Sequence, residues 1–217
     1  MSSIEDEIFS DIQRSISRHR LAPYRMKQPT KKDAVALYLW NMALCGSLYP
    51  LLHCTEVALR NAIHDALYDV TGNRRWFDDE SLLWPNERNR ILEAEVLLKD
   101  TKEQNFAGRV VAEVAFGYWT GLFSIVYERT ILQPIMPLVF WRAPKRERCQ
   151  SALSARVQRI RDLRNRAFHH EPIWKAKDLR QQHAAIVELL DRYKRALSRR
   201  VSQMAGAPEE YHVMRGA

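Results

Sequence analysis

The stretch Arg161-Asp-Leu-Arg-Asn-Arg-Ala-Phe-His-His-Glu-Pro172 closes a helical segment, because Pro172 cannot continue a helix and disfavours helical geometry at Glu171. An apolar stripe at helical spacing leads into it, formed by Leu153, Val157, Ile160, Leu163 and Ala167. Arg164 lies on or beside this stripe. A buried guanidinium without a partner is strongly destabilising, so we expect Arg164 to meet a carboxylate or an anionic ligand.

The spacing of the polar residues limits which of them can meet. Asn165 and His169 are four residues apart and share a face while the helix lasts. Arg164 and His169 are five apart, which separates them by about 140° on an ideal helix. They converge only if the helix loosens near Phe168, which Pro172 favours.

These residue types suit RNA cleavage without a metal. Histidine can take or give a proton near neutral pH while a 2′-hydroxyl attacks the adjacent phosphorus. Arginine stabilises charge on the phosphoryl oxygens, and an asparagine can orient the histidine or the phosphate. The alternative is structural: a capped helix end with an ion-paired arginine.

The positive charge of the chain is concentrated around this stretch. The 217 residues carry a net charge of +8. Residues 145–200 contain 16 Lys/Arg against 6 Asp/Glu, and the rest of the chain contains 18 against 20. Such a field indicates a polyanionic partner, with a basic surface that only aids solubility as the alternative. We expect four arginines to line the approach for RNA phosphates: Arg156, Arg159, Arg161 and Arg166.

Composition favours a folded, helical, cytoplasmic protein. Hydrophobic residues make up 46% of the chain and glycine is scarce, at 7 residues, which favours helices over sheets. The three cysteines are odd in number and form no CxxC, so neither a disulfide framework nor a zinc site is indicated. The acidic N-terminus is unlike a signal peptide. Val114–Tyr127, taken as the most apolar stretch, is too short to span a membrane.

Periodicity and breakers predict the helices. A first amphipathic helix over 4–18 is followed by a linker over 19–29, and Thr30-Lys-Lys-Asp33 resembles a capping box. From there we expect one helix to Gly46 and a second from Ser47, with Pro50 in its first turn, ending at Thr71-Gly-Asn73. The later expectations are helices over 86–104, 110–116, 118–129, 146–167 and 178–201, a break near Gly117, and no regular helix over 131–144.

Weaker constellations have structural alternatives. Glu56, Arg60 and His64 follow one another at i, i+4 and i+8, which suits a helical ion pair. The functional interpretation is that Glu56 pairs with Arg164 and holds it in place, with Arg60 supporting this arrangement. Aromatic residues are expected to pack rather than to bind a ligand: Trp76, Phe77 and Trp84 against the core, and Tyr118, Trp119 and Phe123 within it. His183 is expected to be a packed histidine.

Three stretches resemble the Abi-like (abortive infection) proteins of the HEPN superfamily. Arg164-Asn-Arg-Ala-Phe-His-His-Glu-Pro-Ile173 is similar to their R-N-x-x-x-H-H signature. Glu56-Val-Ala-Leu-Arg-Asn-Ala-Ile-His64 and Val111-Ala-Glu-Val-Ala-Phe-Gly-Tyr-Trp-Thr-Gly-Leu-Phe123 fit the same family. The three come in the family's order and span most of residues 33–200. Phe168 departs from the family pattern, in which Ala often precedes the histidine pair.

The resemblance implies an all-α, HEPN-like helical bundle with additional helices. The domain would span 30–205, after an N-terminal helix and linker (1–29) and before a flexible tail (206–217). It implies metal-independent endoribonuclease activity without a cofactor, and a site often assembled across a homodimer. Carried over, Arg164 faces the phosphate, Asn165 is the polar second position, His169 is the general acid/base and His170 is the second candidate.

The expected role is phage defence or growth arrest in the cytoplasm, with RNA as substrate and an antitoxin or a phage trigger as possible partners. Cleavage would leave 2′,3′-cyclic phosphate and 5′-hydroxyl ends. The alternative function is a non-catalytic RNA- or protein-binding helical module.

Overall fold

The computed structural model describes residues 4–28, 30–98, 105–140, 143–176 and 178–193, and these residues form helices and no strand. This confirms the all-α prediction. The α-helices are α1 (Ile4–Ile16), α2 (Arg18–Arg25), α3 (Lys31–Thr71), α4 (Pro85–Leu98), α5 (Phe106–Glu113), α6 (Phe116–Gly121), α7 (Gln133–Val139), α8 (Gln150–Phe168) and α9 (Leu179–Tyr193). The shorter turns are the 3-10 helices η1 (Trp76–Asp78), η2 (Ile125–Tyr127), η4 (Lys145–Glu147) and η5 (Ile173–Lys175), and the π-helical η3 (Glu128–Leu132).

The central element is α3, whose 41 residues extend for about 60 Å. It begins where the capping box predicts, because the Asp33 amide donates to the Thr30 hydroxyl oxygen at 3.1 Å. It ends at Gly72, which has the left-handed φ of 69° that glycine adopts without strain. Both predicted ends are therefore confirmed.

The predicted break of this helix at Gly46 is wrong, because Pro50 lies inside a continuous α3. Proline removes the N–H that would bond the carbonyl of Gly46 and crowds that carbonyl. Gly46 and Pro50 are both exposed, so water can hydrate the freed carbonyl. Burial of Leu48, Leu51 and Leu52 on the opposite side holds the helix together across the defect.

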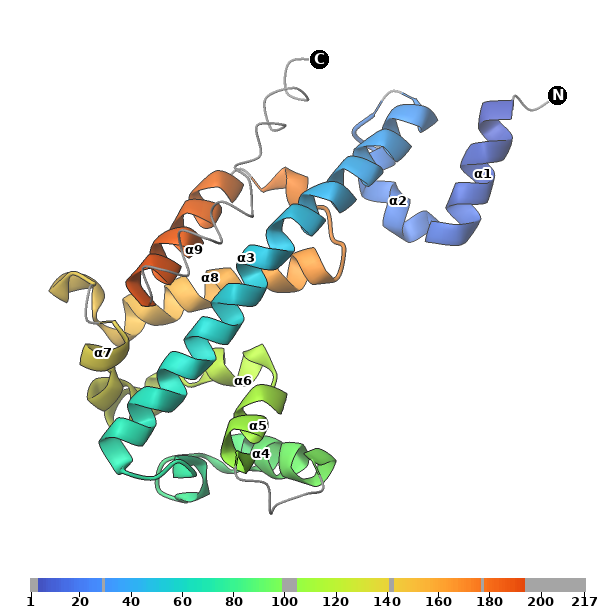
Figure 1. Ribbon diagram of the computed structural model, residues 1–217. Helices are drawn as coiled ribbons and strands as arrows, with labels where there is room; N and C mark the ends of the chain where they lie inside the picture. The colour runs from blue at the N-terminus through green and yellow to red at the C-terminus, as the bar shows by residue number, and fades with distance from the viewer. Residues whose placement is uncertain (1–3, 29, 99–104, 141–142, 177, 194–217) are drawn as a thin grey trace.

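Most other helices pack along α3. Figure 1 shows α3 running the length of the molecule, and α8 and α9 pack against it and against each other. The stripe predicted on α8 is buried as expected, from Leu153 to Ala167. The core also includes Trp76, Trp119 and Phe123, which are at most 2% exposed. One face of α8 is thus fixed, and its C-terminal end lies against the N-terminal half of α3.

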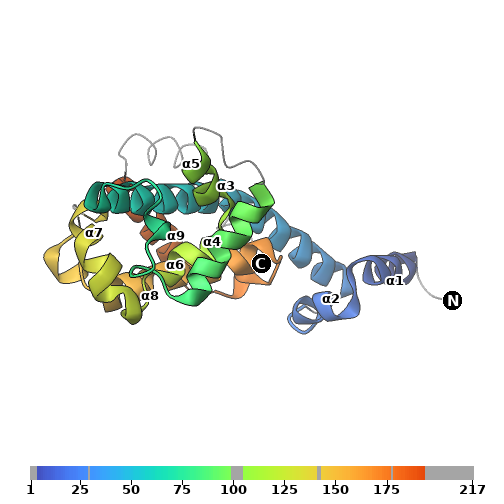
Figure 2. The same ribbon diagram turned by 90° about the horizontal axis from the view of Figure 1, so that it is seen from below.

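The N-terminal segment is helical where a linker was predicted. α1 ends at Ile16, and α2 follows directly after Ser17, with Pro23 inside it. Together with the start of α3 these helices bury a small cluster of their own: Phe9, Leu21, Tyr24, Ala34 and Tyr38. Figures 1 and 2 both show α1 and α2 at one end of the molecule, with α7 at the other. Burial of Leu21 and Tyr24 therefore stabilises a short helix that its composition alone does not predict.

Two further expectations are corrected in the middle of the chain. The break lies at Val114 and Ala115, which are extended, rather than at Gly117. The carbonyl freed there accepts a bond of 3.3 Å from the Trp119 indole. The proline-rich stretch after Ile131 contains α7, with Pro134 in its first turn and Pro137 inside. Its apolar residues Ile135, Met136 and Val139 are buried, which stabilises the helix despite the prolines.

The single helix predicted over 118–129 is wrong, because α6 ends at Gly121 and the short helices η2 and η3 follow. The other helices agree with prediction apart from their ends. Those predicted over 86–104 and 178–201 appear as α4 and α9, and residues 99–104, 194–201 and the predicted tail lie outside the described residues. The helix predicted over 146–167 is α8, preceded by the 3-10 turn η4.

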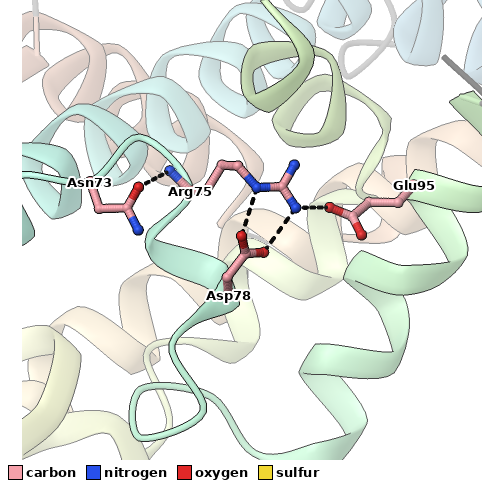
Figure 3. A network of polar contacts seen from close by, with 4 residues as sticks. All are labelled: Asn73, Arg75, Asp78 and Glu95. Carbon is pink, nitrogen blue, oxygen red and sulfur yellow. Dashed lines mark hydrogen bonds and ion pairs between the residues drawn. The ribbon is translucent and has the colours of Figure 1, made fainter. Parts of the chain in front are cut away.

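A polar network fixes the connection after α3 (Figure 3). The Arg75 guanidinium donates to Asp78 at 2.6 and 3.1 Å and to Glu95 of α4 at 2.7 Å, while its amide donates to Asn73. The bonds to the carboxylates of Asp78 and Glu95 raise the pKa of Arg75. The network joins the turn after α3 to α4, and it lies outside the stretch that holds the histidines.

By length and composition alone, α3 could also cross a membrane, with a mean hydropathy of 1.4 over its most apolar 18 residues. The sequence-based expectation took Val114–Tyr127 as the most apolar stretch, and α3 is the longer apolar segment. The core helix of a soluble protein meets the same criterion. Here α3 packs against α2, α7, α8 and α9.

Candidate functional site at the C-terminal end of α8

α8 ends at Phe168, where the sequence predicts that the helix loosens. The amide of His169 still donates to Asn165 at 2.9 Å, and His170 then takes a left-handed φ of 55°. The Glu171 amide turns back to the Arg166 carbonyl at 2.9 Å. This turn is a helix C-cap built on a histidine instead of a glycine. It leaves both His169 and His170 exposed.

Arg164 leans inward from the last turns of α8 and meets a carboxylate, one of the two kinds of partner expected from the sequence. Its Nε lies 3.4 Å from Oε2 of Glu56 on α3, and the two side chains are 27% and 18% exposed. The Nε–H makes no hydrogen bond within the described residues, so the contact is an ion pair and not a hydrogen bond. Arg164 Nη1 donates to Oδ1 of Asn165 at 3.3 Å.

Aromatic rings link Arg164 to His170. The guanidinium lies over the ring of Phe168, 4.4 Å from its centre, and that ring packs on Tyr49 of α3 at 4.7 Å. The Tyr49 hydroxyl lies 3.4 Å from Nδ1 of His170 and 3.4 Å from the Ala167 carbonyl. Phe168, the departure from the family pattern, is therefore the platform on which the arginine stacks.

The turn is tied to α3 by a buried residue that the sequence analysis missed. Asn41 is completely buried; its amide donates to the Glu171 carbonyl at 3.0 Å, and its oxygen accepts from the Trp174 amide at 3.3 Å. Asn41, Tyr49 and Glu56 lie on one side of α3, at spacings of eight and seven residues. A polar residue inside the apolar run that begins α3 is the signal that could have revealed it.

A second missed contact comes from the N-terminal segment. Arg20 of α2 donates from Nη1 to the carbonyl of His169 at 3.0 Å. Nearby, the Tyr24 ring packs at 6.3 Å from that of Trp174, which follows the histidine turn. The predicted linker is therefore part of the surroundings of the site.

The four arginines predicted to line an RNA approach do not share one surface role. Arg156 is 18% exposed and pairs with Glu188 at 2.6 Å and Glu147 at 3.4 Å. With the exposed Arg159 it lines a cavity of about 430 Å³ between α8 and α9. Arg156 is thus engaged by two carboxylates, which weakens its candidacy as a phosphate contact.

The other two arginines are closer to the histidines in sequence and also have partners. The Arg161 guanidinium lies against Gly117 of α6, about 3.8 Å from where a β-carbon would stand. Arg166 donates to the Pro172 carbonyl at 3.0 Å and lies 3.6 Å from the Glu171 carboxylate. Arg166 therefore stabilises the turn that presents the histidines.

The residues Glu56, Arg60 and His64 do not act as one group. Arg60 donates to the Ala112 carbonyl at 3.1 Å and so joins α3 to α5. His64 Nδ1 accepts from the indole of Trp76 at 3.0 Å, and burial lowers the pKa of His64. Glu56 is therefore the member that reaches Arg164, whereas Arg60 and His64 hold α3 to its neighbours.

The packing expectations are largely confirmed. Tyr118, Trp119 and Phe123 are buried core residues, and burial also lowers the pKa of His183. Trp76 and Phe77 pin their loop, whereas Trp84 is 59% exposed and does not.

Comparison with known proteins finds no matching family model, no similar curated protein and no similar solved structure. The resemblance to the Abi-like proteins therefore rests on the quoted motifs.

Proposed function

We propose that this chain is an endoribonuclease of the HEPN type and that the end of α8 is its active site. The single observation that carries the proposal is the state of Arg164. Its guanidinium is held by Glu56 and Phe168. Of its five N–H groups, however, only one on Nη1 donates a hydrogen bond within the described residues. A partly buried cation with unused donors, at the same helix end as two exposed histidines, suits a phosphodiester.

The reaction follows from these groups. One histidine removes the proton of a ribose 2′-hydroxyl, whose oxygen attacks the adjacent phosphorus, and the bond from phosphorus to the 5′-oxygen breaks. A protonated histidine gives its proton to the leaving 5′-oxygen, and Arg164 stabilises the charge on the phosphoryl oxygens. The products carry 2′,3′-cyclic phosphate and 5′-hydroxyl ends.

His169 is the proposed general acid/base, with His170 as the second candidate. Both rings are exposed and reachable by a substrate. The Tyr49 contact orients the ring of His170. Asn165 is proposed to keep Arg164 in place through its contact with Nη1.

The proposal includes a second copy of the chain. Beside Tyr49, α3 exposes a stripe of apolar or small residues at helical spacing, formed by Leu39, Met42, Ala43, Gly46 and Pro50. Leu39 is 55% and Met42 is 44% exposed. Phe168, 36% exposed, lies on the Tyr49 side of this stripe. A homodimer through this surface would cover the stripe and bring two sites together.

The proposed setting is the cytoplasm, in abortive infection or as a growth-arresting toxin, under an antitoxin or a phage trigger. This setting is supported by the resemblance of the three quoted stretches to the Abi-like proteins.

The test compares the purified wild type with Arg164→Ala, His169→Ala and His170→Ala on total RNA, with analysis of the product ends. We expect the arginine variant and at least one histidine variant to lose roughly 10²- to 10⁴-fold in rate. The matched control is Arg129→Ala, an exposed arginine of η3.

Cleavage that needs a divalent metal, or products with 3′-hydroxyl ends, would contradict the mechanism. RNA binding without cleavage would assign the chain to the alternative, a binding module.

A further inference from the structure

We propose that α2 and the connection after it form a binding surface for the RNA strand that enters the site. The proposal rests on the proposed function and adds the surface that holds the substrate. Residues 18–32 contain six Lys/Arg and no Asp/Glu: Arg18, Arg20, Arg25, Lys27, Lys31 and Lys32. Outside this segment and residues 145–200, the chain carries 12 Lys/Arg against 20 Asp/Glu. This is therefore a second basic segment in an otherwise acidic remainder.

The fold fixes this segment beside the histidines. Leu21 and Tyr24 are at most 1% exposed, and the ring of Tyr24 packs on Tyr38 at 5.3 Å and near Trp174 at 6.3 Å. From the same helix, Arg20 reaches the carbonyl of His169 at 3.0 Å. The helix is about 12 Å long, so all of its charges lie within a few nucleotides of the site.

Cations of α2 and of the connection after it are exposed to solvent. Arg18, Arg25 and Lys27 are exposed, whereas Arg156 of α8 is 18% exposed and paired with two carboxylates. Arg18 and Arg25 are seven residues apart and share one side of α2. Exposed Lys and Arg side chains bind phosphates without reading sequence, and they release counterions as they do so. The α2 surface thus suits a nucleic-acid backbone better than Arg156 of α8 does.

The experiment measures RNA binding separately from cleavage. In a His169→Ala/His170→Ala background, the affinity for a single-stranded RNA is measured against salt concentration, with and without Arg18→Glu/Arg25→Glu. The matched control is Arg90→Glu/Arg129→Glu, which changes the net charge equally on exposed residues of α4 and η3. Circular dichroism and thermal unfolding check that each variant folds.

The α2 variant is expected to weaken binding at least tenfold and to lower the slope of log K against log salt by about 1.4, the contribution of two phosphate contacts on a single strand. Arg18→Gln/Arg25→Gln should give a smaller loss in the same direction. The control pair should bind almost as the parent does.

Equal weakening by the control pair would mean that net charge alone matters, and it would overturn the proposal. Normal RNA binding combined with lost binding to vesicles of phosphatidylserine and phosphatidylcholine would assign the surface to a membrane and overturn it as well. If the wild type cleaves RNA but the α2 variant binds normally, this inference fails and the proposed function stands. If the wild type does not cleave RNA but its RNA binding depends on α2, the proposed function fails and the α2 binding surface stands.

Discussion

Arg164 shows how one inward-leaning cation determines the chemistry of its surroundings. It belongs to a mostly buried helix face, where the sequence argument requires an anionic partner. Glu56 supplies the anion and Phe168 supplies a stacking surface. Because Glu56 faces Nε and Asn165 takes one N–H of Nη1, the Nη2 group and the second N–H of Nη1 are left for a phosphate.

We therefore expect Glu56→Ala to lower the cleavage rate by roughly ten- to hundredfold, because a guanidinium without its anchor is misplaced. The free energy of unfolding should fall by about 1 kcal/mol, as for a pair that is partly exposed. Glu56→Gln keeps the size of the side chain but removes its charge, so it separates the loss of the ion pair from the loss of packing. Glu93→Ala, which removes an exposed carboxylate of α4, is the control. Unchanged cleavage and unchanged urea denaturation for Glu56→Ala would contradict this role.

His64 carries a prediction about pH. Burial holds the pKa of His64 below its ordinary value, and a neutral Nδ1 is needed to accept the Trp76 indole. Protonation therefore favours the unfolded chain. The stability contribution is complete above the unfolded pKa of about 6.5 and is lost as the pH falls through the lower folded pKa.

Urea denaturation at about pH 7.5 and about pH 5 tests this dependence. The wild type should lose more stability between the two than His64→Gln, whose amide oxygen can still accept from Trp76. His183→Gln, at a second described histidine whose pKa is lowered by burial, gives the second comparison. An equal loss in wild type and His64→Gln would rule out this role.

At the scale of elements, the contact between α3 and the turn after α8 decides the geometry of the site. Asn41 satisfies one carbonyl and one amide of that turn from a completely buried position. Replacing it with leucine leaves the Trp174 amide without its partner, whereas the Glu171 carbonyl keeps the Ile173 amide, which donates to it at 2.8 Å.

We expect Asn41→Leu to lower the free energy of unfolding by about 2 kcal/mol. The Trp174 amide should also lose protection in hydrogen exchange, because its bond of 3.3 Å to Asn41 is gone. Asn61→Ala, exposed on the same helix, should change neither quantity. If the Trp174 amide of Asn41→Leu stays fully protected from hydrogen exchange, the turn does not depend on Asn41 for its stability.

At the scale of the whole molecule, the proposed homodimer joins copies through the exposed stripe of α3. A glutamate in this stripe would be buried without a partner in the dimer. Met42→Glu should therefore give a monomer in size-exclusion chromatography with light scattering, and RNA cleavage should fall with it. Leu92→Glu, on an apolar residue of α4 that is 53% exposed, should leave both unchanged. A wild type that is monomeric while cleaving RNA would disprove the composite site.

The features that could be predicted are those that depend on neighbours in sequence. The capping box at Thr30, the stop at Gly72 and the buried stripe of α8 are all where periodicity and local chemistry indicate. Proline was the least reliable signal. Pro50 and Pro137 lie inside helices because burial of apolar neighbours outweighs one missing hydrogen bond.

By itself, the sequence determined the helical class, the end of α8, and the presence of Arg164 and two histidines at this helix end, since all three follow from spacing and residue type. The tertiary structure alone decided which charges are engaged. Arg156 is paired across helices with Glu188, and α2 brings Arg20 to His169 from 149 positions away. A residue count cannot foresee such pairs, because the free charge of a surface depends on which side chains folding brings into contact.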